Sequence, residues 1–580
     1  MAKRALRLVS LYSVFALGLV AVLSAQTIAA DGLSPEKVLQ PRALNHTGVY
    51  ELRQIDPNLT GADVNVAVVC RSITYIDGEP QNDYRPNTEH NCFSSTAFGF
   101  HDYDDLSAGV SAHSTAVCSL LFGKDPNASD SELGQFNYQG VVPDAGAGVY
   151  EFWHFLTNNV FTHTPPAADV VTACMGNPFE DWWTRGIESL AEHYGLVVVT
   201  GAGNGSDAFD PVLYPAAGAN VIGVGVVDSV MAAELATRLE QFALASPQHS
   251  SFGPTVDGRC KPDIVAPGNC MTAVADDNNS YEPAGDFSSY STPLVAGTAG
   301  LLIQKAKQDP NLAEALSPVG RTCLIKAVLL NSAKKLPFWH KGRLERDDNH
   351  TAPLDYIQGA GMLNALGAYE QLIAGQNGPG NAAELGWDIN IVGPKAPGKA
   401  YSIDINVPAG KMITATCVWN RHYENRYPFG PLAMSDLRLE LHAIDHDDPN
   451  HSYQLDYSDS RRDNVEHIYT ELKDDFHSYR LVVSFNTKND ANQADVNEPY
   501  ALTWSVSDQP NDDSIFWYDL NADGVVDDSD AGAALYNWLE ATQDGNWYFL
   551  GDINGDGRFD PNDLRMILEQ KGQTADWLTN

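Results

Sequence analysis

The first half of the chain alternates short apolar runs with longer stretches of small and apolar residues. A turn at 61–63 precedes a β-branched run that ends at Val69, and similar runs occupy 168–176 and 196–204. Short apolar runs bounded by turn residues are typical of strands buried on both faces of a parallel sheet. The small and apolar run 298–306 instead predicts a buried helix. Strands that alternate with helices predict an α/β domain with a mostly parallel sheet.

A different pattern follows in the second half of the chain. Residues 376–398 are rich in turn-forming Gly and Pro and predict a linker. Short runs of alternating hydrophobicity then recur from 401 to 507, and this period of two is typical of strands with one buried face. These runs predict a β-sandwich over 399–508. Such a module either binds substrate or braces the domain before it.

The amino terminus has the three parts of an export signal. Basic residues within the first seven positions precede an apolar run from Leu8 to Ala25, and small residues follow at 27–30. We therefore expect residues 1–30 to be a signal peptide and the secreted, extracellular chain to begin near Asp31. Because the apolar run approaches membrane-spanning length, an uncleaved anchor is the alternative.

The net charge of the chain limits the classes of partner that we expect. It contains 36 Lys and Arg against 75 Asp and Glu, a formal net charge of −39. A strongly acidic chain is not drawn to nucleic acid or to anionic membrane surfaces, so neither is expected as a partner. The acidity suits a soluble secreted protein with divalent-cation sites, although solubility alone accounts for much of it.

The eight cysteines are too few in so long a chain for a disulfide scaffold. Cys70, Cys118 and Cys174 lie in apolar or motif contexts and are expected to remain thiols. Cys260 and Cys270 are near enough in sequence to form a bridge, and the sequence leaves that open. There is no C-x-x-C and no zinc-like spacing.

Residues 286–297 place two serines at the start of the predicted buried helix. Exposed N–H groups and the helix dipole favour developing negative charge there, which suits a nucleophile. A serine that merely caps a core helix is the alternative. Together with SSFGPTVDGRCKPDIVAPG at 250–268, this segment resembles the subtilases, the subtilisin-like serine peptidases. Pro293 sets the register, so Ser289 rather than Ser288 matches the nucleophile, and the competing G-x-S-x-G signature is absent.

The resemblance implies roles for three further residues. His113, which begins HSTAVC, matches the general base, and Asn204, which ends the A-G-N strand, matches the oxyanion donor. The orienting acid should follow the strand that ends at Val69, but Cys70 stands there instead. A neutral thiol accepts hydrogen bonds poorly, and its ordinary pKa is near ~8.5, although pairing with a histidine promotes its ionisation. The order of acid, base and nucleophile is otherwise that of subtilisin.

Other departures from the subtilase pattern bear on turnover. Cys174 replaces a cleft-lining serine, and Phe287 replaces the glycine before the two serines, where its ring could crowd the nucleophile. Asp102, Asp104 and Asp105 precede the histidine and offer a replacement acid. Two hypotheses follow. The chain is a serine endopeptidase of weakened activity, or it is a non-catalytic relative that binds peptide or acts as a scaffold.

The C-terminal region contains two copies of an acidic loop, at 519–530 and 552–563. Each reads D-x-N-x-D-G with a carboxylate at the twelfth position, a pattern in which oxygen ligands surround Ca²⁺ and the seventh residue contributes a backbone carbonyl. The pair resembles a dockerin module, which implies a cohesin-like partner. The expected ligands are Asp519, Asn521, Asp523, Val525 and Asp530 in the first loop and Asp552, Asn554, Asp556, Arg558 and Asp563 in the second.

The sequence therefore predicts an α/β fold with a subtilisin-like, mostly parallel sheet and helices on both faces. A β-sandwich and a small all-α, calcium-binding, dockerin-like module are expected to follow. Protein or peptide substrates are expected, with Ca²⁺ in the loops and no cofactor for the catalytic step. The predicted divisions are a signal peptide at 1–30, an N-terminal lead at 31–54, a catalytic domain at 55–375, a linker at 376–398, a β-sandwich at 399–508 and a dockerin-like domain at 515–573.

Overall fold

The computed structural model describes most of the chain after the expected signal peptide, which lies outside the described residues. Within the described part, no helix combines the length and the apolar character needed to cross a membrane. The described residues are 38–71, 75–76, 79–80, 83–103, 109–205, 211–245, 249–342, 350–445, 451–486, 496–508, 517–543, 551–554 and 558–579.

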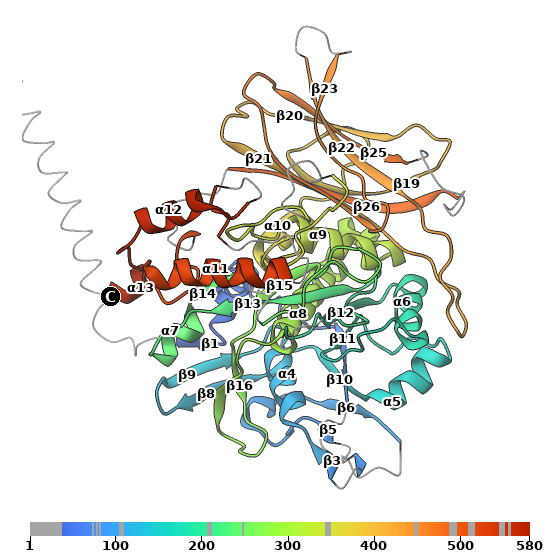
Figure 1. The fold of residues 1–580 in the computed structure, drawn as a ribbon. Helices are drawn as coiled ribbons and strands as arrows, with labels where there is room; N and C mark the ends of the chain where they lie inside the picture. Colours follow the sequence, from blue (N-terminus) through green and yellow to red (C-terminus); the bar gives the residue numbers. More distant parts are fainter. Residues whose placement is uncertain are drawn as a thin grey trace, which may run out of the picture.

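An eight-stranded sheet forms the centre of the first domain (Figure 1). Seven strands follow the order β14-β13-β12-β11-β2-β10-β6, and β15 pairs with β13. Every pair is parallel except that of β13 with β14. The predicted α/β domain with a mostly parallel sheet is confirmed. The strands are β2 (Asn65–Cys70), β6 (Phe98–His101), β10 (Gly146–Glu151), β11 (Val170–Ala173), β12 (Val197–Gly201), β13 (Ile222–Ser229), β14 (Phe242–Ala245) and β15 (Ile264–Pro267).

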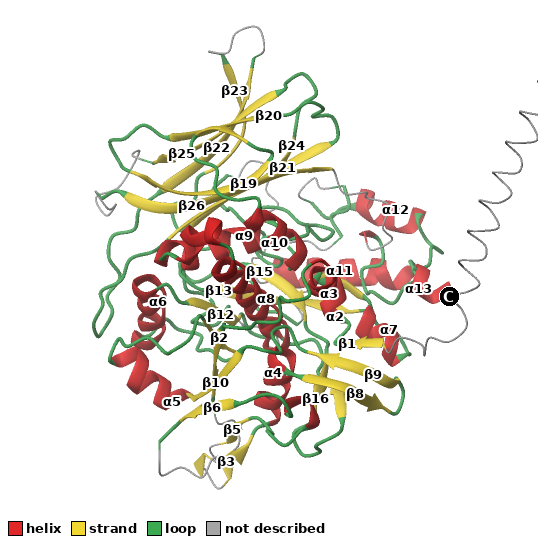
Figure 2. Cartoon of the chain, turned by 180° about the vertical axis from the view of Figure 1, so that it is seen from behind, coloured by secondary structure: helices red, strands yellow, loops and turns green. Residues whose placement is uncertain are grey.

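Helices cover both faces of this sheet, because successive side chains of a buried strand point to opposite sides. Along β2, Val66, Val68 and Cys70 join the apolar core that contains α4 and α8, whereas Ala67 and Val69 join the core that contains α5 and α6. Figure 2 shows these two helical layers. Their members are α4 (Ala112–Phe122), α5 (Phe152–Phe155), η2 (Leu156–Phe161), α6 (Trp182–Tyr194) and α8 (Ser288–Gln308).

The residues before the first sheet strand belong to the same domain. β1 (Val38–Gln40) pairs in parallel with β9 (Gly134–Gln139), and the apolar side chains of α2 (Ala43–His46) and α3 (Val49–Ile55) are buried in the main core. α3 packs against α10 (Ala365–Ile373), which lies more than 300 residues later in the chain. The separate N-terminal lead expected at 31–54 is therefore wrong for the described residues 38–54.

Shorter elements surround the sheet and complete the domain. They are β3 (Tyr75–Ile76), β4 (Glu79–Pro80), β5 (Asp83–Arg85), η1 (Asn91–Phe93), β7 (Gly109–Val110), β8 (Lys124–Asp130), α7 (Leu235–Glu240), β16 (Met271–Ala273), β17 (Tyr281–Pro283), η3 (Pro310–Leu316), η4 (Gly320–Leu324) and α9 (Ile325–Asn331).

Two mainly antiparallel sheets form a second domain, called here the two-sheet domain (residues 380–508). Their orders are β18-β20-β25-β22-β23 and β19-β26-β21-β24, and one apolar core lies between them. The linker expected at 376–398 is wrong, because β18 and β19 lie within it and pair with later strands. The strands are β18 (Gly380–Ala382), β19 (Leu385–Val392), β20 (Lys399–Asp404), β21 (Lys411–Trp419), β22 (Leu437–Ile444), β23 (Ser452–Ser458), β24 (Val465–Glu471), β25 (Ser478–Phe485) and β26 (Glu498–Asp508).

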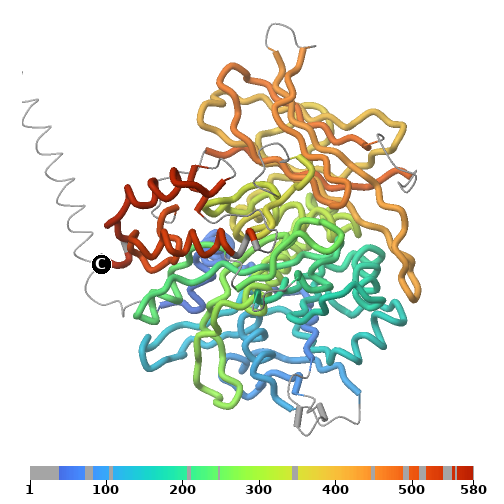
Figure 3. Tube along the Cα trace, in the orientation of Figure 1, coloured from blue at the N-terminus to red at the C-terminus, as the bar shows by residue number. Residues whose placement is uncertain are grey.

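The four-stranded sheet lies against helices α9 and α10 of the first domain (Figure 3). Trp387 is fully buried at this contact, where its indole N–H donates to the carbonyl of Leu372 at 2.8 Å. Gln371 of α10 donates to the carbonyl of Trp504 at 2.9 Å. Apolar burial combined with satisfied polar groups fixes one orientation between domains. The two-sheet domain is thus packed against the first domain through a buried contact.

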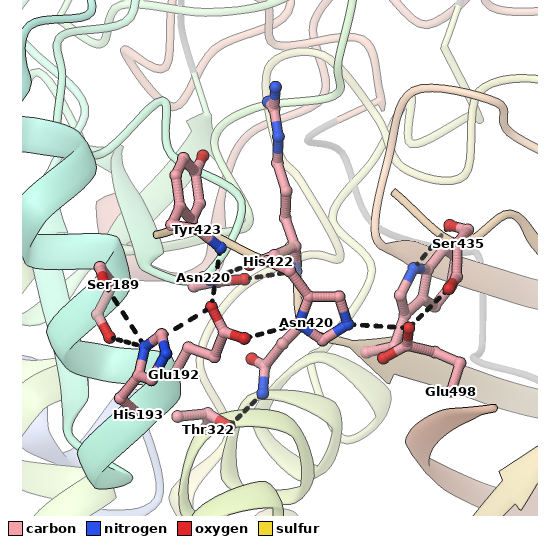
Figure 4. Close-up of polar contacts among 12 residues, drawn as sticks. Ser189, Glu192, His193, Asn220, Thr322, Asn420, His422, Tyr423, Ser435 and Glu498 are labelled. Atoms are coloured by element: carbon pink, nitrogen blue, oxygen red, sulfur yellow. Dashed lines mark hydrogen bonds and ion pairs between the residues drawn. The ribbon is translucent and has the colours of Figure 1, made fainter. Parts of the chain in front are cut away.

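A polar cluster adds a second connection between the two domains (Figure 4). The imidazole of His422 lies between two carboxylates, Glu192 of α6 at 2.5 Å and Glu498 of β26 at 3.0 Å. Glu192 also accepts from the backbone N–H of Tyr423, and Glu498 accepts from the hydroxyl of Ser435. Each side chain in the cluster is therefore positioned by more than one element.

The C-terminal module consists of α11 (Asp528–Gln543), α12 (Pro561–Glu569) and α13 (Asp576–Thr579), with the acidic loops before α11 and α12. It packs on the first domain, where the N–H of Met231 donates to the carbonyl of Ala522 at 2.8 Å and Trp517 meets the edge of Phe338. The module extends beyond the expected end at 573, because Trp577 packs against Gly524.

Candidate active site

The carboxyl ends of three neighbouring strands and the starts of two helices meet at one edge of the parallel sheet. Cys70 ends β2, Cys174 follows β11, and Asn204 follows β12. His113 is the second residue of α4, and Ser289 is the second residue of α8. In open α/β sheets this is the edge where ligands bind. The topology thus brings every catalytic position expected from the sequence to one place.

Ser289 does not cap its helix. The N-cap residue of α8 is Phe287, whose side chain makes no capping bond, and the first helical residue is Ser288. In the described part of the chain the hydroxyl of Ser289 forms no hydrogen bond and is half-buried. The helix-cap alternative therefore does not apply to Ser289, and its hydroxyl lies uncommitted at the positive end of a helix of 21 residues.

Asn204 is held by the residue before the nucleophile position. Its Oδ1 accepts from the backbone N–H of Ser288 at 3.1 Å and from the Ser288 hydroxyl at 2.9 Å. The backbone donor fixes which side of the amide is oxygen. The Nδ2 group has no partner among the described residues and remains available as a donor. Sequence reasoning gave Ser288 no part in the site, although its place beside the expected nucleophile was a usable signal.

His113 presents a neutral imidazole. Burial lowers its pKa, and the described residues offer it neither a hydrogen bond nor an ion pair. Its ring contacts that of Tyr290, the residue after Ser289, with centroids 6.3 Å apart. No hydrogen bond joins His113 to Ser289 in the described structure. Catalytic hydrogen bonds are often long or poorly aligned before substrate binds. Tyr290 was also missed by sequence reasoning.

Cys70 cannot serve as an anionic partner for this histidine near neutral pH. The side chain is only 4% exposed, and burial raises the pKa of its thiol to about 11. The hydroxyl of Ser114, the residue after His113, opposes this shift to a smaller extent. A protonated thiol lacks the charge that stabilises an imidazolium in a serine–histidine–aspartate triad.

The nearby carboxylates in the described residues have other partners. Asp102 forms an ion pair with Arg85 at 2.5 Å and a hydrogen bond with Tyr84, which together lower its pKa against the effect of burial. Glu151 pairs in register with Cys70, but its carboxylate caps α5 by accepting from the N–H of His154 at 2.8 Å. Asp102 is thus not the replacement acid suggested by the sequence. The other two candidates, at 104 and 105, lie outside the described residues.

Two further substitutions flank the nucleophile position. The thiol of Cys174 donates to the backbone carbonyl of Ser289 at 3.3 Å. Phe287 is 44% exposed and packs edge-on against Tyr290, with centroids 6.2 Å apart, so its ring lies at the surface, partly covered by Tyr290. The bridge between Cys260 and Cys270 that the sequence left open is absent, because both are free, buried thiols.

The first acidic loop is folded around its own carboxylates. Asp519 accepts from the N–H groups of Asp523 and Gly524, and Asp530 accepts from those of Leu520 and Asp527. Burial and the neighbouring negative charges raise the pKa of Asp519 to about 6. The carboxylates at the first and last loop positions are thus held by the backbone of their own loop, and the charge of Asp530 acts on Asp519.

The second loop repeats this geometry in its described part. Asp563 accepts from the N–H groups of Ile553, Asn554 and Asp560, as Asp530 accepts from Leu520, Asn521 and Asp527 in the first loop. Residue 556, an expected ligand, lies outside the described residues. No group of three or more His, Cys, Asp or Glu side chains in the described chain is already arranged to hold a metal ion.

A parallel α/β sheet that presents Ser, His and Asn at its carboxyl edge is the arrangement of a serine hydrolase. The chain belongs to the subtilase family, whose model matches residues 43–361. It is 27% identical to pyrolysin from Pyrococcus furiosus over 317 residues, covering 48% of this chain and 21% of pyrolysin. It is 44% identical to C5a peptidase from Streptococcus pyogenes over 88 residues, covering 15% of this chain and 7% of that protein.

Among solved structures, the patellamide maturation protease PatA aligns with a TM-score of 0.38 and 19% identity, covering 54% of this chain and 98% of that chain. The chain matches about a fifth of the length of pyrolysin and less than a tenth of C5a peptidase. The family membership makes a serine peptidase the parent class of this domain.

Proposed function

We propose that this chain is a secreted, subtilisin-like serine endopeptidase with slow turnover. Ser289 is the nucleophile, His113 is the general base, and Asn204 is the oxyanion donor. The observation that carries the proposal is the anchored amide of Asn204. Its oxygen is committed to Ser288 and its Nδ2 group is not, so an amide donor is held at the start of α8, one residue before Ser289. A preorganised donor of this kind is often the largest single contribution to acyl transfer.

The reaction follows from these groups. The Ser289 oxygen attacks the peptide carbonyl carbon as its proton passes to the neutral imidazole of His113. The negative charge that develops on the carbonyl oxygen is stabilised by the Asn204 amide and by the positive end of α8. The imidazolium then gives the proton to the leaving amine, and water releases the acyl group by the same route.

The rate is limited by the missing carboxylate. Among the described residues, no carboxylate fixes the imidazole tautomer of His113 or stabilises its imidazolium. Removal of the aspartate alone from subtilisin lowers turnover by about 3 × 10⁴, and subtilisin remains active. That factor corresponds to about 6 kcal/mol. The thiol of Cys70 is protonated near neutral pH and does not replace the carboxylate. We therefore expect turnover here to be reduced by a factor similar to that in subtilisin without its aspartate.

The decisive experiment labels the full chain with a fluorophosphonate and measures hydrolysis of a small peptide ester. Wild type should label slowly, and Cys70→Asp should label and turn over faster by up to about 10⁴. Ser289→Ala should abolish both signals. Ser129→Ala, which removes an exposed hydroxyl on β8, is the matched control and should leave both unchanged. Failure of folded wild type and Cys70→Asp to label would refute the proposal.

A non-catalytic peptide-binding role is the second candidate. It is favoured by one observation, the lack of a carboxylate partner for His113 among the described residues. In that case a peptide would bind with the same affinity to wild type and Ser289→Ala, and neither would release product.

We further propose that the two acidic loops bind Ca²⁺. Burial raises the pKa of Asp519 and of Asp530, and the negative charge of Asp523 adds to both shifts, so a divalent cation would relieve that repulsion. The ion would be a structural one and would take no part in peptide hydrolysis. The repeated geometry of the two loops supports a dockerin-like module and hence a cohesin-like protein partner. Binding of the intact chain to an immobilised cohesin, with and without chelator, tests that partner.

A further inference from the structure

Two departures from the subtilase pattern are cysteines, and the strand register places them side by side. β2 and β11 are neighbouring parallel strands in which Val66 pairs with Val170 and each following residue pairs in turn, up to Val69 with Ala173. Continued by one residue beyond β11, this register puts Cys174 opposite Cys70. In agreement with that placement, Cys70 adds to the effect of burial in raising the pKa of Cys174. Two positions 104 residues apart in sequence therefore become direct neighbours across two strands.

Both thiols also point to the same face of the sheet. Cys70 belongs to the apolar core beneath α4 and α8, and Cys174 packs against that same core. Neighbouring strands lie about 4.8 Å apart, and disulfides span Cα separations of about 4.4–6.8 Å. The register therefore satisfies the main geometric condition for a bridge without a change in strand order.

The two cysteines differ in access. Cys70 is buried, whereas Cys174 is half-buried at the end of its strand. A third thiol, Cys118 of α4, belongs to the same core and is fully buried. A soluble oxidant would thus react with Cys174 first. Cys70 is the neighbouring thiol that could then attack the Cys174 sulfur and release the bound half of the oxidant.

We propose that Cys70 and Cys174 are a redox pair that closes to a cross-strand disulfide beside the nucleophile position. The oxidant is a small-molecule disulfide. The Cys174 thiolate attacks one sulfur of the oxidant. This attack forms a mixed disulfide between Cys174 and half of the oxidant, and the other half leaves as a thiol. The Cys70 thiolate then attacks the Cys174 sulfur and releases the second thiol. Two protons leave the cysteines, and two electrons reduce the oxidant to two thiols.

Closure changes the surroundings of Ser289. The thiol of Cys174 loses the proton that it donates to the Ser289 carbonyl, so this contact at the start of α8 is broken. Closure also removes the thiol from the position where the family has its acid. An effect on peptide hydrolysis rests on the proposed function, but formation of the bond does not.

Peptide mapping of the full chain tests the bond itself. The protein is reduced, freed of reductant, incubated with oxidised glutathione, alkylated and digested. The expected product is one cross-linked peptide that contains Cys70 and Cys174. Cys70→Ser should instead retain glutathione on Cys174, and Cys174→Ser should leave Cys70 to be alkylated. Cys323→Ser, which changes a buried thiol of η4 instead of one beside β2 or β11, is the matched control and should still yield the cross-link.

The rate gives a second readout. Burial raises the pKa of both thiols, and the thiolate is the reactive form. Cross-linking should therefore accelerate about tenfold per pH unit between pH 7 and 9. Alkylation of both cysteines in oxidant-treated wild type, or a bond from Cys174 to Cys118, would overturn the proposal. These outcomes are independent of any peptidase activity.

Discussion

His422 should stabilise the contact between the two domains only while its imidazole is charged. Its two ring nitrogens face Glu192 and Glu498, so both must carry protons for both hydrogen bonds to form (Figure 4). The hydrogen bond to Glu192, then that to Glu498, raises the pKa of His422 from 6.5 to about 10 against the effect of burial. The perturbation is His422→Gln, which removes the charge and keeps a polar side chain.

The magnitude follows from the shift in pKa. At about 1.4 kcal/mol per pKa unit, the change corresponds to at most about 5 kcal/mol. The side chain is 27% exposed, and solvent screening reduces this to about 2–3 kcal/mol. Because the folded pKa is raised, the stabilisation is complete below pH 6.5 and is lost as the pH rises towards 10.

Thermal unfolding followed by near-UV circular dichroism between pH 6 and 10 measures this effect. At pH 6 the variant should unfold about 5 °C below wild type, taking about 2–4 °C per kcal/mol for domains of 150–250 residues. At pH 10 the two should coincide. His451→Gln, which alters an exposed ring stacked on Tyr453, is the control and should show no such dependence. A difference between wild type and His422→Gln that is equal at pH 6 and pH 10 would refute the reasoning.

Three further outcomes are expected. Asn204→Ala should lower peptide-ester turnover by about 10²–10³ while fluorophosphonate labelling shows that the hydroxyl of Ser289 is still present. Chelator should reduce the helical circular dichroism of the C-terminal module, and an unchanged spectrum with no heat of calcium binding would contradict the cation site. Gly524→Ala should destabilise that module by about 1–3 kcal/mol, because a Cβ at its φ of +86° would lie 2.6 Å from Trp577. Gly375→Ala has a similar φ and open space, and comparison of their melting curves separates contact from backbone strain.

The sequence predicted the elements that carry local signals. The β-branched run before Cys70 forms a strand, and His113 and Ser289 lie at helix starts where the motifs placed them. Each of these features is encoded by the apolar pattern or the motif of one short segment, without a contribution from a distant part of the chain. The same local character allowed the acidic loops to be located.

Features that depend on distant partners were not predictable in the same way. Residues 385–392 lie in a Gly- and Pro-rich stretch, yet they form β19 because β26, more than 100 residues later, supplies its hydrogen-bond partners. The hydrogen bond from the Ser288 hydroxyl to Asn204 joins residues 84 positions apart. The proposed pairing of Cys70 with Cys174 depends on β2 and β11 being neighbours in the sheet, which no local pattern encodes.

At the end of β2, the residue that favours stability and the residue that favours catalysis differ. An ionised carboxylate at the depth of Cys70 would cost several kcal/mol unless it were paired. Glu151, its neighbour in register on β10, adds a like charge nearby. We expect His113, which matches the base of the family pattern, to compensate that charge, whereas a protonated thiol at this position needs no compensation. The described domain therefore retains its sheet and its anchored Asn204 although Cys70 stands at the acid position, and the sheet by itself does not report on turnover. It follows that Cys70→Asp should raise activity and lower stability together, and that replacing His113 with Ala in the same chain should remove the gain and deepen the loss.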